Sequence, residues 1–313
     1  MKSSPVTVAD LRRSVLSVPP LCRNADLSLS ETENRRMVQH LRAGGVTTHL
    51  WGGNANLYNM GLKEFAPFLK MAETIAEDDE WVIPSIGADF GKAMDQAEIL
   101  SETRFPTAMI LPMRFPADRK GVAKGIARIA EKAKRPLIIY YKDDGYLDPA
   151  DLGALVRDGS ACAVKYGTVR ANPGVDAELA TILKHVDKDL VISGIGERPI
   201  VDHAQVFGLR AFTSGCVCIA PRLSMDILRA ITAGDWAEAM RIRESFMPSE
   251  DLRDRYSPLR VLHASVALSR VAATGPAYPM LSEIDDPVAL KAIETEGLKL
   301  RAANDARLAR AAE

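Results

Sequence analysis

The chain of 313 residues is 47% hydrophobic, which is ample for a core, and its formal net charge at pH 7 is −1. A chain so close to neutral lacks the basic surface that nucleic acid requires and a polybasic patch for a membrane surface, so we expect neither partner. The four cysteines include no Cys-x-x-Cys pair, and no stretch approaches the length of a membrane span. The sequence therefore predicts a reduced, cytoplasmic protein with no metal and no cofactor.

Short apolar runs alternate with amphipathic helical segments over the first two thirds of the chain. Ser30 with Glu33 predicts a capping box at the start of one such helix, which runs to Gly44. The predicted strands are 14–18, 46–51, 81–87, 107–112, 137–142, 160–166, 190–193 and 211–214. Eight strand-and-helix repeats are the number that closes a (β/α)8 TIM barrel of the α/β class.

Beyond Pro221 the pattern is helical to the end of the chain. The predicted helices are 223–231, 236–246, 252–273 and 288–302, with a break at Gly275–Pro279 between the last two. We expect a barrel over residues 1–234 and a C-terminal helical extension over residues 235–313.

One lysine follows an apolar run in the middle of the barrel. The run from Ser160 to Tyr166, bounded by Gly159 and Gly167, is typical of a parallel strand that is covered on both faces. Burial of Lys165 would lower its pKa and leave a neutral amine that can attack a carbonyl group. The alternative is a lysine whose side chain reaches from the strand end into water.

In such barrels the reacting groups lie at the C-terminal ends of the strands and in the loops that follow. Tyr140 ends the strand before that of Lys165, so the two side chains can converge on one mouth. The turn at Gly52, Gly53 and Asn54 would present backbone N–H groups to a carboxylate, although a tight turn uses glycine without any ligand. The other polar positions at this end are Arg114, Lys142, Arg170, Gly194 to Arg198, and Thr213 to Cys216.

The pattern resembles the dihydrodipicolinate synthase and N-acetylneuraminate lyase family of Schiff-base enzymes from about Val15 to about Gly234. Gly52–Asn56 falls where that family has a glycine-rich loop, Tyr140 at its proton-shuttling tyrosine, and Lys165 at its imine-forming lysine. Gly208–Leu223 looks like the eighth strand of the family and the helix after it.

The resemblance implies a lyase that joins Lys165 to a small 2-oxo acid such as pyruvate and then cleaves or forms an aldol, or dehydrates a keto-deoxy sugar acid. Tyr140 would move protons, and Thr213 would lie near the bound acid. The family is usually a tetramer built from dimers, so a homo-oligomer is implied.

Three departures separate the chain from the synthases of that family. Gly53 and Asn54 stand where the synthases have hydroxyl residues, and the segment Leu111–Pro116 contains no tyrosine to reach across a subunit interface. The arginine that holds the second substrate is also missing after Tyr140. Lys142 points to the same side of the predicted strand as Tyr140. It is one candidate to replace the missing arginine, together with Arg114, Arg170 and Arg198.

Three further interpretations stay open at this stage. The chain could be an authentic 4-hydroxy-tetrahydrodipicolinate synthase in spite of these departures. It could instead bind keto acids without turning them over. Finally, Ser193–Gly196 could hold the phosphate group of an isomerase substrate, with Gly194 in the turn.

Overall fold

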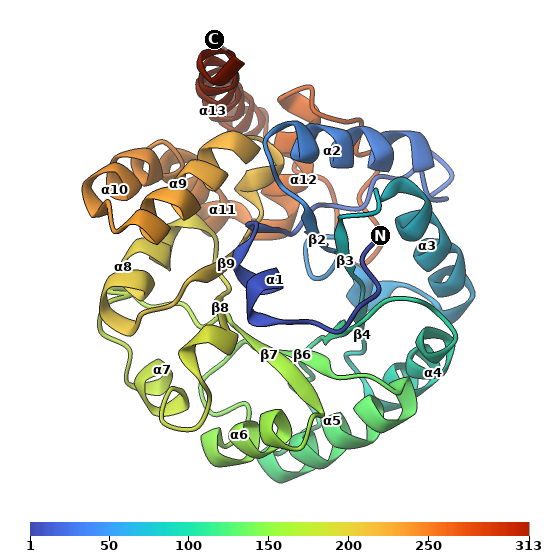
Figure 1. The fold of residues 1–313 in the computed structure, drawn as a ribbon. Helices are drawn as coiled ribbons and strands as arrows, with labels where there is room; N and C mark the ends of the chain where they lie inside the picture. Colours follow the sequence, from blue (N-terminus) through green and yellow to red (C-terminus); the bar gives the residue numbers. More distant parts are fainter. Residues whose placement is uncertain (313) are drawn as a thin grey trace.

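A computed structural model describes residues 1–312 and shows a ring of parallel strands inside a ring of helices (Figure 1). The strands lie in the order β3-β2-β1-β9-β8-β7-β6-β5-β4, and all of their pairings are parallel. Their bounds are β1 Leu16–Ser17, β2 Thr48–Leu50, β3 Trp81–Ile83, β4 Ser85–Ile86, β5 Ala108–Ile110, β6 Leu137–Tyr141, β7 Ala161–Tyr166, β8 Val191–Ser193 and β9 Ala211–Ser214.

The first and last strands of that order are two halves of one strand. Only Pro84 separates β3 from β4, and proline has no N–H group for the ladder. Its carbonyl oxygen still accepts a hydrogen bond from the Met109 N–H at 2.8 Å. Because β3 pairs with β2 and β4 pairs with β5, this strand closes the ring. The fold is the predicted (β/α)8 TIM barrel.

Helices surround the barrel, and the last five gather on one side of it, where α9 packs against α2 and α10 packs against α8 (Figure 1). Among the helices described, none combines the length and the apolar content that crossing a membrane requires. Their bounds are α1 Val8–Arg12, α2 Glu31–Ala43, α3 Leu62–Ile75, α4 Phe90–Ser101, α5 Arg119–Ala133, α6 Pro149–Arg157, α7 Ala177–Ile182, α8 Glu197–Phe207, α9 Pro221–Ala233, α10 Trp236–Glu244, α11 Met247–Tyr256, α12 Pro258–Leu268 and α13 Pro287–Ala312, with short 3-10 turns η1 Leu57–Asn59, η2 Lys188–Leu190 and η3 Cys216–Cys218.

Two local predictions were wrong. The Ser30 side chain forms no capping hydrogen bond, and its N–H donates to the Cys22 carbonyl oxygen at 3.1 Å; the Glu33 carboxylate accepts from the backbone N–H of Ala273 at 2.6 Å. The single helix predicted over 252–273 is two helices, α11 and α12. Pro258 removes an N–H donor and disfavours a helical conformation at Ser257, whose φ of 175° is extended.

The C-terminal helices share a core with the barrel. Phe246 of α10–α11, Leu262 of α12 and Leu300 of α13 belong to the same buried cluster as Val15 and Phe212 of the barrel. The predicted boundary at Gly234 coincides with the end of α9, where this glycine has a φ of 74°. The division into two domains stays a prediction, and its last residue, Glu313, lies outside the described residues.

Candidate active site

Lys165 and Tyr140 lie side by side at the C-terminal ends of β7 and β6. They are direct partners in the register of these two strands. Lys165 is 4% exposed and Tyr140 is 9% exposed. The Lys165 Nζ atom lies 3.5 Å from the centroid of the Tyr140 ring and donates a hydrogen bond to the Gly194 carbonyl oxygen at 3.1 Å. The two strands thus place an amine and a phenol at one point.

Burial shifts both groups toward their neutral forms. It lowers the pKa of Lys165 well below its ordinary value, and the nearby charges of Lys142 and Arg253 lower it further. Burial also raises the pKa of Tyr140, and the Asp143 carboxylate adds to this rise. A neutral amine is a nucleophile, and a neutral phenol can donate a proton and can both donate and accept hydrogen bonds.

Two glycines make room for this pair. A Cβ atom at Gly167 would lie 2.6 Å from Cε2 of Tyr140, so only glycine lets the ring take its place. A Cβ atom at Gly194 would lie 2.4 Å from the Tyr166 carbonyl oxygen and 3.1 Å from Cγ of Lys165. Gly194 therefore serves close packing, and its carbonyl oxygen orients the amine.

A cavity of about 190 Å³ opens above Lys165. This is smaller than the roughly 300–1,000 Å³ of sites for drug-sized ligands and suits a small acid. Of the residues predicted for substrate binding, Gly52 is not among the residues that line it, because this glycine packs under the loop against Met109. The cavity is lined by Gly53, Asn54, Tyr58, Met109, Tyr140, Lys142, Lys165, Gly194, Ile195, Gly196, Thr213, Gly215, Glu250, Arg253, Asp254 and four apolar residues.

The turn after β2 carries donors for an anion. Within residues 1–312 the backbone N–H groups of Gly53 and Asn54 have no acceptor. The Asn54 side chain donates to the Val18 carbonyl oxygen at 2.8 Å, and the Asn56 side chain donates to the Tyr278 carbonyl oxygen at 3.1 Å. The turn is therefore held from both sides, and its N–H groups are available to a carboxylate.

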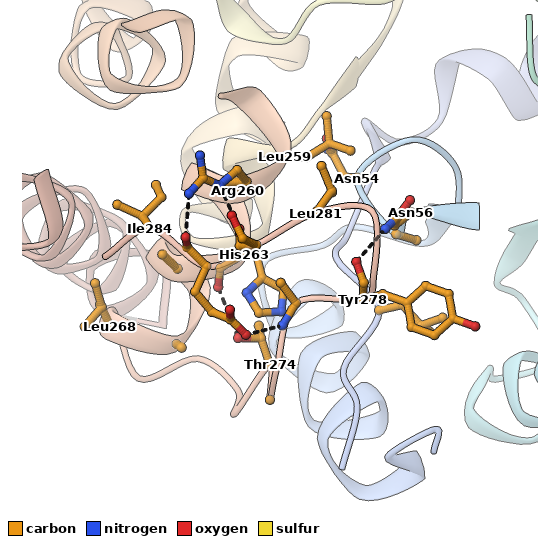
Figure 2. A pocket seen from close by; sticks show the side chains of 18 of the residues that line it. Asn54, Asn56, Leu259, Arg260, His263, Leu268, Thr274, Tyr278, Leu281 and Ile284 are labelled. Carbon is orange, nitrogen blue, oxygen red and sulfur yellow. Dashed lines mark hydrogen bonds between the residues drawn. The ribbon is translucent and has the colours of Figure 1, made fainter. Parts of the chain in front are cut away.

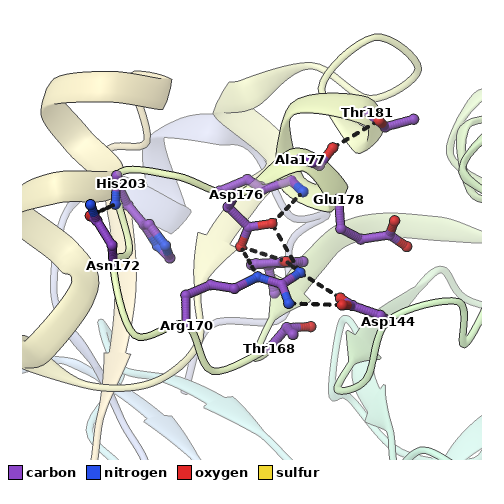
Figure 3. A network of polar contacts seen from close by, with 12 residues as sticks. Asp144, Thr168, Arg170, Asn172, Asp176, Ala177, Glu178, Thr181 and His203 are labelled. Carbon is purple, nitrogen blue, oxygen red and sulfur yellow. Dashed lines mark hydrogen bonds and ion pairs between the residues drawn. The ribbon is translucent and has the colours of Figure 1, made fainter.

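Among the cations proposed for the far end of a substrate, only Lys142 lines the cavity in the described part of the chain. Arg114 and Arg198 pair with aspartates at 2.9 and 2.6 Å. Arg170 lies between Asp144 and Asp176, with contacts of 2.5 to 3.0 Å, and ties the loops after β6 and β7 together (Figure 3). These three arginines are already occupied by carboxylates.

Sequence reasoning missed several residues of the cavity, among them Tyr58 and Arg253. Arg253 comes from α11, outside the barrel, and its guanidinium contacts the Glu250 carboxylate at 3.0 and 3.1 Å. A glutamate three residues before an arginine is ordinarily a solvated pair on a helix surface, so no signal marked it. Tyr58 lies in the 3-10 turn η1, after the predicted turn. The alternation of side chains along a strand therefore could not predict which way it points.

Glu250 of the cavity wall belongs to a buried cluster with Glu197 and Cys216, in which one carboxylate oxygen or sulfur atom of each side chain lies within 4.8 Å of the others. Burial, together with the charge of Glu250, raises the pKa of Glu197 to about 7. Hydroxyl groups of Ser214 and Ser224 donate to the Glu197 carboxylate. The Arg253 guanidinium already neutralises Glu250, which argues against a cation in this position.

The Ser193–Gly196 turn is poorly suited to a phosphate group. The N–H groups of Gly194 and Gly196 both donate to carbonyl oxygens of neighbouring strands, at 2.6 and 3.0 Å. Glu197 begins the next helix, and a Cβ atom at Gly196 would lie 2.9 Å from a carboxylate oxygen of Glu250. Two carboxyl groups would thus face any phosphate bound there.

A second cavity, of about 240 Å³, lies between α12, the 274–284 segment and the turn after β2 (Figure 2). It shares Asn54 and Leu259 with the first cavity. Its Arg260 donates to the carbonyl oxygens of Ser282 and Glu283, and most of its other lining residues are apolar. The buried amine of Lys165 and the phenol of Tyr140 line the first cavity, which is therefore the candidate site.

The fold and the first cavity define a TIM-barrel protein with a buried lysine amine at the barrel mouth, and known proteins share the architecture. The chain matches the Dihydrodipicolinate synthetase family over residues 15–288. A probable 5-dehydro-4-deoxyglucarate dehydratase from Streptomyces coelicolor is 23% identical over 246 residues, which are 74% of this chain and 73% of that protein.

Two solved structures show the same fold. Dihydrodipicolinate synthase from Bacillus clausii has a TM-score of 0.81 at 20% identity, covering 95% of this chain and 99% of that one. N-acetylneuraminate lyase from Aliivibrio salmonicida has a TM-score of 0.78 at 14% identity, covering 93% and 97%. The chain belongs to the dihydrodipicolinate synthetase family, and the protein is an enzyme of the lyase class.

Proposed function

We propose that the protein is a Schiff-base lyase that acts on a keto-deoxy sugar acid through Lys165. The observation that carries the proposal is the buried Lys165 amine, 3.5 Å from the centroid of the Tyr140 ring in a cavity of about 190 Å³. The dehydratase name of the Streptomyces coelicolor relative favours loss of water over carbon–carbon cleavage.

The chemistry begins when the Lys165 amine attacks the C2 carbonyl carbon of the 2-oxo acid and water leaves. The resulting iminium ion acidifies C3, so that loss of a C3 proton gives an enamine. The enamine then expels the C4 hydroxyl group, which takes a proton from the Tyr140 phenol and departs as water. For aldol cleavage, the phenolate form of Tyr140 would instead have to remove the C4 hydroxyl proton as the C3–C4 bond breaks, and the raised pKa of Tyr140 disfavours that form.

Reductive trapping tests the proposal. The protein is incubated with pyruvate or with 2-keto-3-deoxy sugar acids, borohydride is added, and the modified peptide is identified by mass spectrometry. We expect the adduct on Lys165, its loss in Lys165→Met, and its retention in Lys142→Met, which removes the other lysine of the cavity. Absence of any adduct at Lys165 would refute the proposal.

Turnover assays separate the related alternatives. A barrel that only binds keto acids would give the adduct without consuming any sugar acid. An authentic synthase would condense pyruvate with a second substrate, which the missing arginine after Tyr140 argues against. We expect consumption of a keto-deoxy sugar acid and no such condensation.

A further inference from the structure

The proposed reaction needs a base for the C3 proton, and few groups of the cavity can act as one. Tyr140 is unsuited, because its raised pKa keeps the phenol protonated. The same holds for Tyr58, whose pKa is also raised by burial. Lys142 and Arg253 carry the positive charges that lower the pKa of Lys165. A carboxylate of the cavity wall is therefore the better candidate.

Two carboxylates line the cavity within residues 1–312. The Asp254 side chain is 57% exposed and pairs with Arg198 at 3.2 Å. Glu250 is only 3% exposed. Its carboxylate accepts hydrogen bonds from the Arg253 guanidinium at 3.0 and 3.1 Å, which compensate its negative charge. Glu250 is thus the buried anion of the cavity wall.

A short turn connects Glu250 with the buried lysine. The Lys165 amine donates to the Gly194 carbonyl oxygen at 3.1 Å. Two residues further along, a Cβ atom at Gly196 would lie 2.9 Å from a carboxylate oxygen of Glu250, so a residue without a side chain lets the carboxylate approach the turn. Because two residues span at most about 7 Å, the amine and the carboxylate reach the cavity from neighbouring parts of its wall.

A second buried carboxylate shows that Glu250 is more than half of a structural ion pair. Glu197 is fully buried, and one of its carboxylate oxygens lies within 4.8 Å of one of Glu250. The hydroxyl groups of Ser214 and Ser224 donate to Glu197 at 2.7 and 2.5 Å. One guanidinium thus faces two buried carboxylates, although a single carboxylate would satisfy it and burying a charge is costly. Repulsion between the carboxylates favours uptake of a proton by the pair, as a base requires.

We propose that Glu250 is the base that takes the C3 proton of the Schiff-base intermediate. The inference rests on the proposed imine at Lys165. The C3–H bond breaks, and its proton passes to a carboxylate oxygen of Glu250. The electron pair of that bond forms the C2–C3 double bond, and the π pair of the C=N bond moves to the Lys165 nitrogen, which loses its positive charge. Arg253 holds the carboxylate in place, and the neighbouring Glu197 favours its protonated form.

Hydrogen exchange into pyruvate tests this role without knowledge of the natural substrate. A base that acts on the pyruvate imine in heavy water replaces the C3 protons with deuterium, so the methyl signal in proton NMR fades. The exchange rate is divided by the fraction of Lys165 that borohydride traps at the same pyruvate concentration, which corrects for any change in imine formation. For Glu250→Gln we expect an adduct at Lys165, with the exchange rate per imine lower by about 10²–10⁴.

Two further variants separate basicity from structure. Glu250→Asp keeps a carboxylate and should exchange faster than Glu250→Gln. Asp251→Asn removes the neighbouring exposed carboxylate of α11, which pairs with Arg198 and does not line the cavity, and should exchange like the wild type. Equal loss of exchange in Glu250→Asp and Glu250→Gln would overturn the role of Glu250 as a base.

The outcomes separate the two proposals. No adduct at Lys165 with any keto acid would defeat the imine itself. An adduct without exchange in the wild type, or undiminished exchange per imine in Glu250→Gln, would overturn the role of Glu250 and leave the imine standing. Loss of exchange in Tyr140→Phe with retention in Glu250→Gln would assign the proton to the phenol instead.

Discussion

Burial drives the pKa values of Lys165 and Tyr140 in opposite directions, and each shift produces the neutral form that the proposed chemistry uses. The Tyr140→Phe variant separates the two roles. Its ring still packs over Lys165, so imine trapping should persist with pyruvate. Turnover of the sugar acid should fall by about 10²–10⁴ in kcat, which is typical for loss of a general acid or base. Steady-state kinetics beside trapping measure both, and an unchanged kcat would contradict the role of the phenol.

The buried Lys165 should also lower the free energy of unfolding. Its pKa in the folded protein lies well below 10.5, so the unfolded chain binds this proton more readily, and stability falls as the pH falls from 10.5 toward the lowered pKa. Lys165→Met removes this cost.

We therefore expect a higher melting temperature for Lys165→Met at pH 7, by roughly 2–4 °C for each kcal/mol regained, and a smaller gain near pH 10. Thermal unfolding of both proteins at the two pH values measures this. The exposed Lys120→Met serves as the control. A gain in melting temperature that is larger near pH 10 than at pH 7 would show that burial does not lower the pKa of Lys165.

At the scale of elements, the packing at the strand ends aims the reacting groups. Gly167 follows β7, and Gly167→Ala would drive a Cβ atom into the Tyr140 ring. Such overpacking ordinarily costs about 1–3 kcal/mol, and here it also displaces the phenol from Lys165. We expect a lower melting temperature and a lower kcat. Gly61→Ala, at the N-cap of α3 with nothing within 4 Å, should leave kcat unchanged and lower the melting temperature only through the poorer cap. Normal kinetics in Gly167→Ala would show that the ring position is not critical.

The elements were predictable where apolar runs alternate with amphipathic segments, because a parallel strand covered on both faces has few alternatives. Prediction failed where a distant segment competes for a side chain, as at Glu33, which bonds to Ala273 instead of capping its own helix. It also failed at Pro258, which was read as part of one long helix. The break there brings Pro258 and Leu259 to the cavity wall.

At the scale of the whole molecule, the candidate site is assembled from the barrel and from the helices that follow it. Lys165 and Tyr140 could be placed at the mouth from strand positions alone. Arg253 could not, because nothing local distinguishes its pairing with Glu250 from a surface pair on α11. Its burial depends on how α11 folds back over the ends of β8 and β9, which is a tertiary property.

Asn304 of α13 links the last helix to the barrel. It is fully buried, and its side-chain oxygen accepts from the Arg222 N–H in the first turn of α9 at 2.8 Å. Asn304→Ala leaves this N–H without a partner, which costs about 1–2 kcal/mol, as for loss of a helix cap. We expect the melting temperature to fall by several degrees in a single transition.

Imine trapping at Lys165 should be unchanged in Asn304→Ala well below the melting temperature, because Asn304 is not among the residues that line the cavity. The exposed Lys299→Ala, on the same helix, is the matched control and should unfold like the wild type. Since α13 and the barrel share one buried cluster, we expect calorimetry to show the whole chain unfolding together. Two separate transitions, with only the weaker one shifted, would mean instead that the C-terminal helices form an independent unit docked on a self-sufficient barrel.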